Sequence, residues 1–214
     1  MGAVQEGAPG EARKWKNEAR DVHTARAKAE GQLSNLTNTT GRARKYADYE
    51  RFYFCWQLDW HGRAYPVQSF LTPQGSDLAK GLLQFADGKP LGKRGGYWLK
   101  IHLANCYGNK IDKKSFEERL AWVKQYEQAI LDSARYPIDG VKLWTEAEDP
   151  WQFLAAAMEY SEWYDSGYSE EFVSNIPVGV DGSCNGLQHL SALMRDREGA
   201  HHVNMLHVCE PQDI

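Results

Sequence analysis

The spacing of apolar residues predicts one long, thin helix near the N-terminus. From Glu11 onward, apolar or small residues recur at intervals typical of one helix face, at Ala12, Trp15, Ala19, Val22, Ala29, Leu33 and Leu36. The other faces are rich in Arg, Lys and Glu, which is typical of a solvated surface. The polar stretch SNLTNTTG at 34–41 predicts a turn that ends this pattern. The small and polar residues from Met1 to Gly10 predict a disordered lead-in.

A run of aromatic residues then predicts extended structure. RFYFCWQLDW at 51–60 favours a buried strand. GRAYPVQSF at 62–70 predicts a second extended segment, in which Pro66 limits pairing because it lacks an N–H donor. After a loop, Asp77 is expected to cap a short helix that runs to Phe85.

The middle of the chain predicts three longer helices. YWLKIHLANCY at 97–107 precedes Gly108, a residue typical of helix ends. SFEERLAWVKQYEQAILDSA at 115–134 begins with the spacing of a capping box, formed by Ser115 and Glu118. DPWQFLAAAMEYSEWY at 149–164 places a proline in the first helical turn.

Composition narrows the class of protein. The 214 residues are 42% hydrophobic, so the chain can fill a core, and its apolar runs fall far short of the ~20 residues of a membrane span. The start carries no hydrophobic signal core, which favours a soluble intracellular protein. The four cysteines form no Cys-x-x-Cys pair, so buried free thiols are expected instead of a zinc ribbon or disulfide framework, at Cys55, Cys106, Cys184 and Cys209.

The net charge of −4 conceals an uneven distribution. Residues 51–110 hold eight Lys and Arg against three acids, whereas residues 111–176 hold six against fourteen. A basic block beside an acidic one indicates that the first faces an anionic partner and the second faces water. Nucleic acid is one such partner.

A carboxylate stands between a predicted strand and a predicted helix in IPVGVDGSCNGLQHLSALMRD, at 176–196. Asp181 follows the apolar run 176–180 and so stands at the end of the predicted strand. Ligands of open sheets commonly bind at the carboxyl ends of the strands. Gly182 lets the backbone come close to a ligand, so that its carbonyl can act as a second oxygen donor for a hard cation. Asp-Gly is also one of the commonest turn pairs, which needs no metal. The local pattern leaves both interpretations open.

A second element combines residues suited to nucleic acid. DWHGRAYP contains Asp59, Trp60, Gly62 and Arg63. Arginine binds phosphate through two nitrogens, glycine lets a backbone pass closely, and tryptophan offers a face on which a base can stack. The alternative is an ion pair between Asp59 and Arg63 at a turn, with Trp60 in the core.

The two elements together resemble the single-subunit, bacteriophage-type RNA polymerases, which include phage and mitochondrial enzymes. DWHGRAYPVQSFLTPQGSDLAKGLLQFADGKPLGKRGGYWLKIHLANCYG contains an Asp-x-x-Gly-Arg motif, and VGVDGSCNGLQHLSALMRDREGAHHVNML is similar to polymerase motif A. The resemblance runs in order from about Arg51 to Ile214. Two long motifs at a family-like separation are more specific than one short pattern.

The resemblance implies an α+β fold: part of a right-hand polymerase, with many helices around a small antiparallel sheet. Residues 1–45 would be the lead-in and the end of the thumb. Residues 46–214 would be the first half of the palm, with the Asp-x-x-Gly-Arg element, a helical region at 96–172 and motif A at 176–195.

The resemblance also implies roles for individual residues. Asp181 would be the catalytic aspartate that binds two Mg²⁺ ions, with the carbonyl of Gly182 helping to hold one of them. The nucleotide site would lie near Ser183, Asn185 and Gly186. Contacts to the RNA–DNA hybrid and template are expected from Asp59, Trp60, Gly62, Arg63, Tyr65 and Lys80.

The implied activity is DNA-directed RNA synthesis, in which nucleotides from ribonucleoside triphosphates are added to the RNA 3′ end. The remaining fingers and palm would be partners of this chain. The second metal-binding aspartate, the fingers helix and the promoter-binding region have no counterpart in the sequence, so the isolated chain is expected to be inactive. The helix start EPQDI at the C-terminal end likewise favours a partial chain.

Two other functions stay open: a non-catalytic nucleic-acid-binding module, and a metal-dependent phosphohydrolase built on the Asp181 turn. A zinc site is not favoured, because the ligand spacing matches no standard pattern at His201, His202, His207 and Cys209. The residues of the first motif, from Asp59 to Gly108, favour a phage enzyme in the cytoplasm of an infected bacterium. The alternative location is the mitochondrial matrix.

Overall fold

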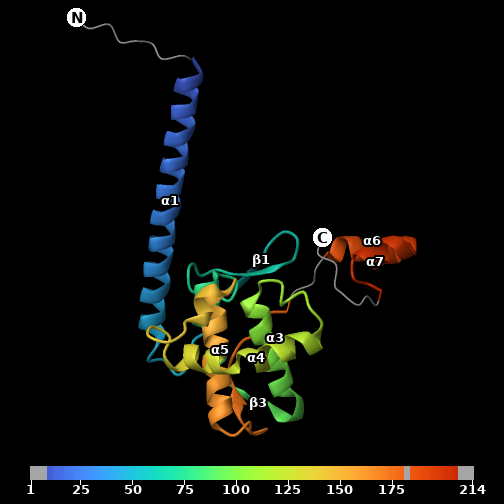
Figure 1. The fold of residues 1–214 in the computed structure, drawn as a ribbon. Helices are drawn as coiled ribbons and strands as arrows, with labels where there is room; N and C mark the ends of the chain where they lie inside the picture. The colour runs from blue at the N-terminus through green and yellow to red at the C-terminus, as the bar shows by residue number, and fades with distance from the viewer. Residues whose placement is uncertain (1–8, 181–183, 207–214) are drawn as a thin grey trace, which may run out of the picture. The chain divides into compact units, whose positions relative to one another are not determined.

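The computed structural model describes residues 9–180 and 184–206 and divides the chain into two units, Met1–Tyr49 and Glu50–Ile214. In the first unit, α1 (Pro9–Tyr46) is one continuous helix, drawn in blue in Figure 1. The predicted turn at 34–41 is therefore wrong. Its polar side chains bond back along the helix, as when the Thr37 hydroxyl donates to the Leu33 carbonyl at 2.9 Å and Thr40 does so to Leu36 at 2.8 Å. These bonds satisfy groups that would otherwise favour a turn.

The second unit is organised around three helices that pack pairwise: α3 (Gly92–Tyr107), α4 (Phe116–Arg135) and α5 (Pro150–Asp165). All three were predicted. Gly108 ends α3 with a positive φ of 66°, and Ser115 and Glu118 form the capping box of α4. The core is made of side chains that are almost fully buried, including Leu103, Val123, Ile130, Phe153 and Tyr160.

Close helix packing depends on glycine at two points. A Cβ at Gly96 of α3 would overlap the ring of Trp163 on α5. A Cβ at Gly81, the last residue of α2 (Asp77–Gly81), would lie 2.7 Å from the carbonyl oxygen of Trp151. The helix α2 can therefore rest directly on the first turn of α5. A short 3-10 helix, η1 (Leu143–Glu146), connects α4 to α5.

The strands among the described residues form two short antiparallel ribbons. One hairpin pairs β1 (Trp56–Leu58) with β2 (Ala64–Pro66), and the other ribbon pairs β3 (Lys89–Pro90) with β4 (Val173–Ser174). The expected α+β class, helix-rich with a little antiparallel sheet, is confirmed. The prediction of a long buried strand at 51–60 is wrong, because the hairpin is short and both of its strands are largely exposed. A two-stranded ribbon has too few neighbours to bury its side chains.

The last described segment forms two helices, α6 (Asn185–Met194) and α7 (Arg197–His202). The helix predicted to follow the Asp181 turn, within motif A, is confirmed. Residues 176–180, expected to be a strand, form neither a helix nor a strand in the described part of the chain. The described helices include none that is both long and apolar enough to cross a membrane.

The cysteines only partly follow the prediction of buried thiols. Cys106 is buried and Cys184 is half-buried, but Cys55 is exposed beside the hairpin. Cys209 lies outside the described residues, as does His207. His201 and His202 belong to α7.

Candidate nucleic-acid interface

The tip of the β1–β2 hairpin is organised by Asp59. One of its carboxylate oxygens, Oδ1, accepts hydrogen bonds from the backbone N–H groups of His61 and Arg63, both at 2.9 Å. The backbone N–H of Asp59 also donates to the Arg63 carbonyl at 2.9 Å. Gly62 has a φ of 77°, a left-handed conformation that suits glycine, and this lets the chain reverse between the strands. The carboxylate thus holds the loop that presents Arg63.

The same contacts keep Asp59 ionised. The hydrogen bond from the backbone of Arg63 lowers the pKa of this carboxyl most; partial burial opposes that effect, and contacts from His61 add to it. The guanidinium charge of Arg63 is the smallest of these influences. The Arg63 side chain is exposed and makes no ion pair within the described residues, so the expected alternative of an Asp59–Arg63 ion pair is not what holds the turn.

The aromatic residues of the hairpin face outward. The side chain of Trp60 is 87% exposed, and its ring lies 3.3 Å from the His61 ring, centroid to centroid, at 35°. Tyr65 is 40% exposed on the second strand, opposite Gln57. The alternative in which Trp60 belongs to the core is therefore wrong. An exposed ring and an exposed guanidinium on one rigid turn can contact a base and a phosphate together.

A groove of about 660 Å³ lies in the same unit. Residues 176–180 line one wall of the groove, and the exposed Lys80 near the end of α2 lines it as well. Gln74 connects this groove to the hairpin, because its side-chain amide donates to the carbonyl of Ala64 at 3.0 Å. His102 lines the groove from α3, and burial lowers its pKa to about 4, so it is neutral near pH 7. Lys80 is therefore the cationic residue among those that line the groove.

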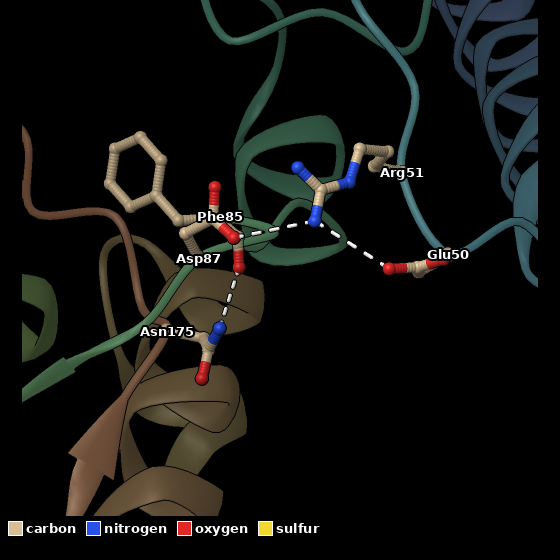
Figure 2. A network of polar contacts seen from close by, with 5 residues as sticks. All are labelled: Glu50, Arg51, Phe85, Asp87 and Asn175. Atoms are coloured by element: carbon tan, nitrogen blue, oxygen red, sulfur yellow. Dashed lines mark hydrogen bonds and ion pairs between the residues drawn. The ribbon is translucent and has the colours of Figure 1, made fainter.

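The chain that leads to Asp181 is anchored just before it reaches the groove. β4 pairs with β3, and Asn175 exchanges two hydrogen bonds with Phe85: the Phe85 N–H donates at 2.8 Å, and the Asn175 amide donates at 2.6 Å. The Asn175 N–H also donates to Glu159 at 3.1 Å. Figure 2 shows this anchor beside the Arg51 side chain, which lies between Asp87 and Glu50 at 3.4 and 3.5 Å. The backbone direction of residues 173–175 is thus fixed from several sides.

The predicted metal-binding residues Asp181 and Gly182 lie outside the described residues, and so does Ser183. Asn185 and Gly186 are exposed in the first turn of α6. The described residues contain no group of three His, Cys, Asp or Glu that could hold a metal ion. One carboxylate and one backbone carbonyl are nevertheless oxygen donors of the kind that Mg²⁺ prefers, and they suit part of a larger magnesium site.

Sequence reasoning did not identify two residues that position the site. Gln74 joins the groove to the hairpin, and the carboxylate of Asp77 bonds to the N-terminus of α5 instead of capping its own helix. Ser76 stands at the cap position of α2, and that helix ends at Gly81, before the predicted Phe85. The loop TPQGSD contains both residues, but its composition carries no signal for such distant partners.

Comparison with known proteins identifies the family. A family model described as DNA-dependent RNA polymerase matches residues 89–214, more than half of the chain. The chain belongs to this family. The resemblance to single-subunit, phage-type RNA polymerases is thereby confirmed.

Relatives of the chain include organellar enzymes. The chain is 44% identical to "DNA-directed RNA polymerase 1, mitochondrial" of Nicotiana sylvestris, over 94% of this chain and 20% of the relative. It is 43% identical to the mitochondrial DNA-directed RNA polymerase of Schizosaccharomyces pombe, over 94% of this chain and 17% of that protein. The chloroplastic polymerase 3B of Nicotiana tabacum is also 43% identical, over 95% and 21%. The chain thus spans about a fifth of these polymerases, and the expected bacterial-host location gains no support from them.

Proposed function

We propose that this chain is the part of a DNA-directed RNA polymerase that carries the first metal-binding aspartate and a hairpin for the template and RNA. The family match over residues 89–214 carries the proposal. The exposed hairpin supports it, because Trp60 and Arg63 offer a stacking surface and a phosphate ligand on one fixed turn. The complete enzyme would use a DNA template and ribonucleoside triphosphates and would extend the RNA 3′ end.

In this proposal the hairpin holds nucleic acid through complementary contacts. The guanidinium of Arg63 binds a backbone phosphate, while the rings of Trp60 and Tyr65 contact bases or sugars. Asp59 positions Arg63 through the backbone, and Gly62 permits the reversal. Lys80 adds a cation at the groove. These contacts are largely independent of sequence, as a polymerase requires for a moving template.

The catalytic part of the proposal concerns Asp181. Its carboxylate and the carbonyl of Gly182 would hold Mg²⁺, with a second carboxylate contributed by another part of the polymerase. Bound magnesium would supply charge stabilisation for the attacking and leaving oxygens of phosphoryl transfer. Ser183, Asn185 and Gly186 would border the incoming nucleotide. Because this chain supplies one aspartate of the pair, we propose that it does not polymerise by itself.

The proposed domain assignment places the end of the thumb at 1–45 and the first half of the palm at 46–214. The proposed compartment is the mitochondrial matrix, because the relatives include mitochondrial polymerases of plants and of fission yeast. Imaging of the tagged protein against mitochondrial and plastid markers tests the location.

A chimeric polymerase tests the function. Residues 14–206 would replace the matching part of the Schizosaccharomyces pombe enzyme, and extension of an RNA primer on a DNA template would be measured. The chimera is expected to extend the primer, Asp181→Asn is expected to abolish extension while template binding persists, and Arg63→Ala is expected to weaken binding on the order of tenfold. Asp139→Asn, an exposed carboxylate in a turn, is the matched control.

Two results would contradict the proposal. Full extension by the Asp181→Asn chimera would remove Asp181 from catalysis. A well-folded chimera that binds the template but never extends the primer would instead indicate a nucleic-acid-binding module without polymerase activity.

A further inference from the structure

A second aromatic and basic cluster lies where α3 meets the start of α4, formed by the exposed Arg94, Trp98 and Phe116 and the buried Arg119. Trp98 and Phe116 pack edge to face, with ring centroids 5.7 Å apart at 84°. The Arg94 guanidinium lies 6.0 Å from the Trp98 ring, and that of Arg119 lies 5.1 Å from the Phe116 ring. Two rings in contact thus have a guanidinium at each end, and we call these four residues the α3–α4 aromatic cluster.

The cluster is rigid but open to solvent. The buried guanidinium of Arg119 donates to the Lys114 carbonyl and to the Asn105 side chain, both at 2.8 Å, which fixes the start of α4 against α3. Trp98 and Phe116 nevertheless remain 45% and 47% exposed. A rigid, half-exposed ring can accept a flat partner with little loss of side-chain entropy.

The indole N–H of Trp98 differs in its partner from those of two other tryptophans. Trp144 and Trp163 donate their indole N–H groups to the carbonyls of Pro137 and Ser169, at 2.8 and 3.1 Å. That of Trp98 makes no hydrogen bond within the described residues. The indole N–H of Trp122 in the core also makes no hydrogen bond within the described residues, so this donor does not by itself mark a ligand site. Because Trp98 is 45% exposed, its N–H is accessible to water or to a ligand.

The charge around the cluster favours an anionic ligand. Residues 89–114 contain seven Lys and Arg and one acid, Asp112. The exposed Lys93 and Arg94 lie at the start of α3, next to the turn that ends in Trp98. Two exposed acids, Glu117 and Glu118, follow in the first turn of α4, and the Glu118 carboxylate keeps its charge while it accepts hydrogen bonds from the Ser115 N–H and hydroxyl at 3.1 and 2.8 Å. The basic residues still outnumber the acids around the cluster.

We propose that the α3–α4 aromatic cluster binds single-stranded nucleic acid, with a base stacked on Trp98 and phosphates on Arg94 and Lys93. Stacking on an indole tolerates every base, and phosphate contacts add no sequence preference, so the site takes single strands of any sequence. Single-stranded DNA or RNA is the ligand, because the bases of a duplex are not free to stack on Trp98. The site is separate from the hairpin of Asp59 and Arg63 and adds a contact that the proposed function does not require.

Binding of the full 214-residue chain to a fluorescent single-stranded oligothymidylate, measured by anisotropy, tests this site. Trp98→Ala is expected to weaken binding about fivefold or more, Trp98→Phe to retain most of it, and Arg94→Ala to reduce the salt dependence by about one phosphate contact. Tyr136→Ala is the matched control, since this ring is 60% exposed at the opposite end of α4. Circular dichroism verifies the fold of each variant.

The remaining outcomes separate this inference from the proposed function. If Trp98→Ala binds as tightly as the parent chain, or if Trp98→Phe is as weak as Trp98→Ala, the stacking site is wrong. An unchanged Trp98→Ala beside a weakened Arg63→Ala would overturn this inference and leave the hairpin intact as the nucleic-acid contact. A weakened Trp98→Ala beside an unchanged Arg63→Ala would support the cluster and contradict the role of the hairpin.

Discussion

The carboxylate of Asp77 accepts a 2.8 Å hydrogen bond from the backbone N–H of Trp151, although 74 residues separate the two in the chain. The next N–H, that of Gln152, donates to the same carboxylate at 3.0 Å. Asp149, at the cap position of α5, makes no capping bond with its own side chain. The N-terminus of α5 is therefore capped by Asp77 of α2. This contact links α2, which lines the groove through Lys80 and Gly81, to the core.

Substitution Asp77→Ala is expected to lower the free energy of unfolding by about 1–2 kcal/mol, because two N–H groups of α5 lose their acceptor. Asp77→Asn keeps an acceptor oxygen but loses the charge that favours a helix N-terminus, so its loss is expected to be smaller. Urea denaturation followed by circular dichroism measures both. An Asp77→Ala variant as stable as the parent would show that water caps α5 equally well.

Alanine is expected to have opposite effects at two helical glycines. Gly81→Ala places a Cβ 2.7 Å from the Trp151 carbonyl oxygen, and since backbone cannot move cheaply, the loss is expected to be about 1–3 kcal/mol. At Gly31 in α1 an added Cβ meets nothing within 4 Å. Gly31→Ala is therefore expected to stabilise the helix by about 0.5–1 kcal/mol and to raise its helicity. Thermal melts measure the first variant and far-ultraviolet circular dichroism the second. Equal effects at both positions would contradict close packing of α2 on α5.

The stability of the chain is expected to fall in mild acid because of His102. Burial lowers the pKa of this imidazole to about 4, whereas the unfolded chain binds the proton below about pH 6.5. The unfolded state therefore binds more protons between these values, and the contribution to stability is full above pH 6.5 and lost as the pH falls toward 4. The difference amounts to roughly 3 kcal/mol.

Urea denaturation at pH 7, 5.5 and 4.5 checks this prediction by comparison with His102→Gln. The variant is expected to lose less stability than the parent over this interval. His189→Gln, at an exposed position of α6, is expected to follow the parent. Parallel curves for the parent and His102→Gln would mean that the imidazole binds its proton at the same pH in the folded and in the unfolded chain.

The order of the hairpin tip is expected to depend on the Asp59 carboxylate. Asp59→Ala removes the acceptor for the N–H groups of His61 and Arg63, so these amides are expected to exchange hydrogen severalfold faster. Asp59→Asn keeps an acceptor oxygen and is expected to stay close to the parent. Hydrogen exchange read by mass spectrometry on peptides covering 56–66 measures the change. If the alanine variant exchanges like the parent, backbone bonds suffice to hold the turn.

The helices of the core were predictable because their signals are local. Ser115 and Glu118 form the expected capping box, and Gly108 ends α3 as its position predicts. In α1, by contrast, turn-forming residues from Ser34 to Thr40 accept or donate hydrogen bonds within the helix, a choice that composition does not reveal. Local propensity is a weak guide wherever a polar side chain has two ways to satisfy the backbone.

The sequence predicted which residue types form the candidate site, but it did not predict the contacts that hold them in place. The motif predicted an exposed role for Arg63, yet aromatic content favoured a buried strand for the residues before it, and Trp60 is 87% exposed. Aromatic richness is the same signal for a core and for a binding surface, and only the number of packing neighbours separates them. The contacts of Gln74 and Asp77 join segments distant in sequence, and no short pattern encodes them.

The side-chain amide of Gln74 links the hairpin to the wall of the groove, because it donates a hydrogen bond to the Ala64 carbonyl from the loop before α2. Ala64 pairs with Leu58 beside the turn that presents Arg63. A displacement of that turn can therefore be transmitted to the groove through the Gln74 side chain, without a change in the core. Without this contact the hairpin and the groove would move independently. A nucleic acid bound to the hairpin would then no longer fix the position of the groove.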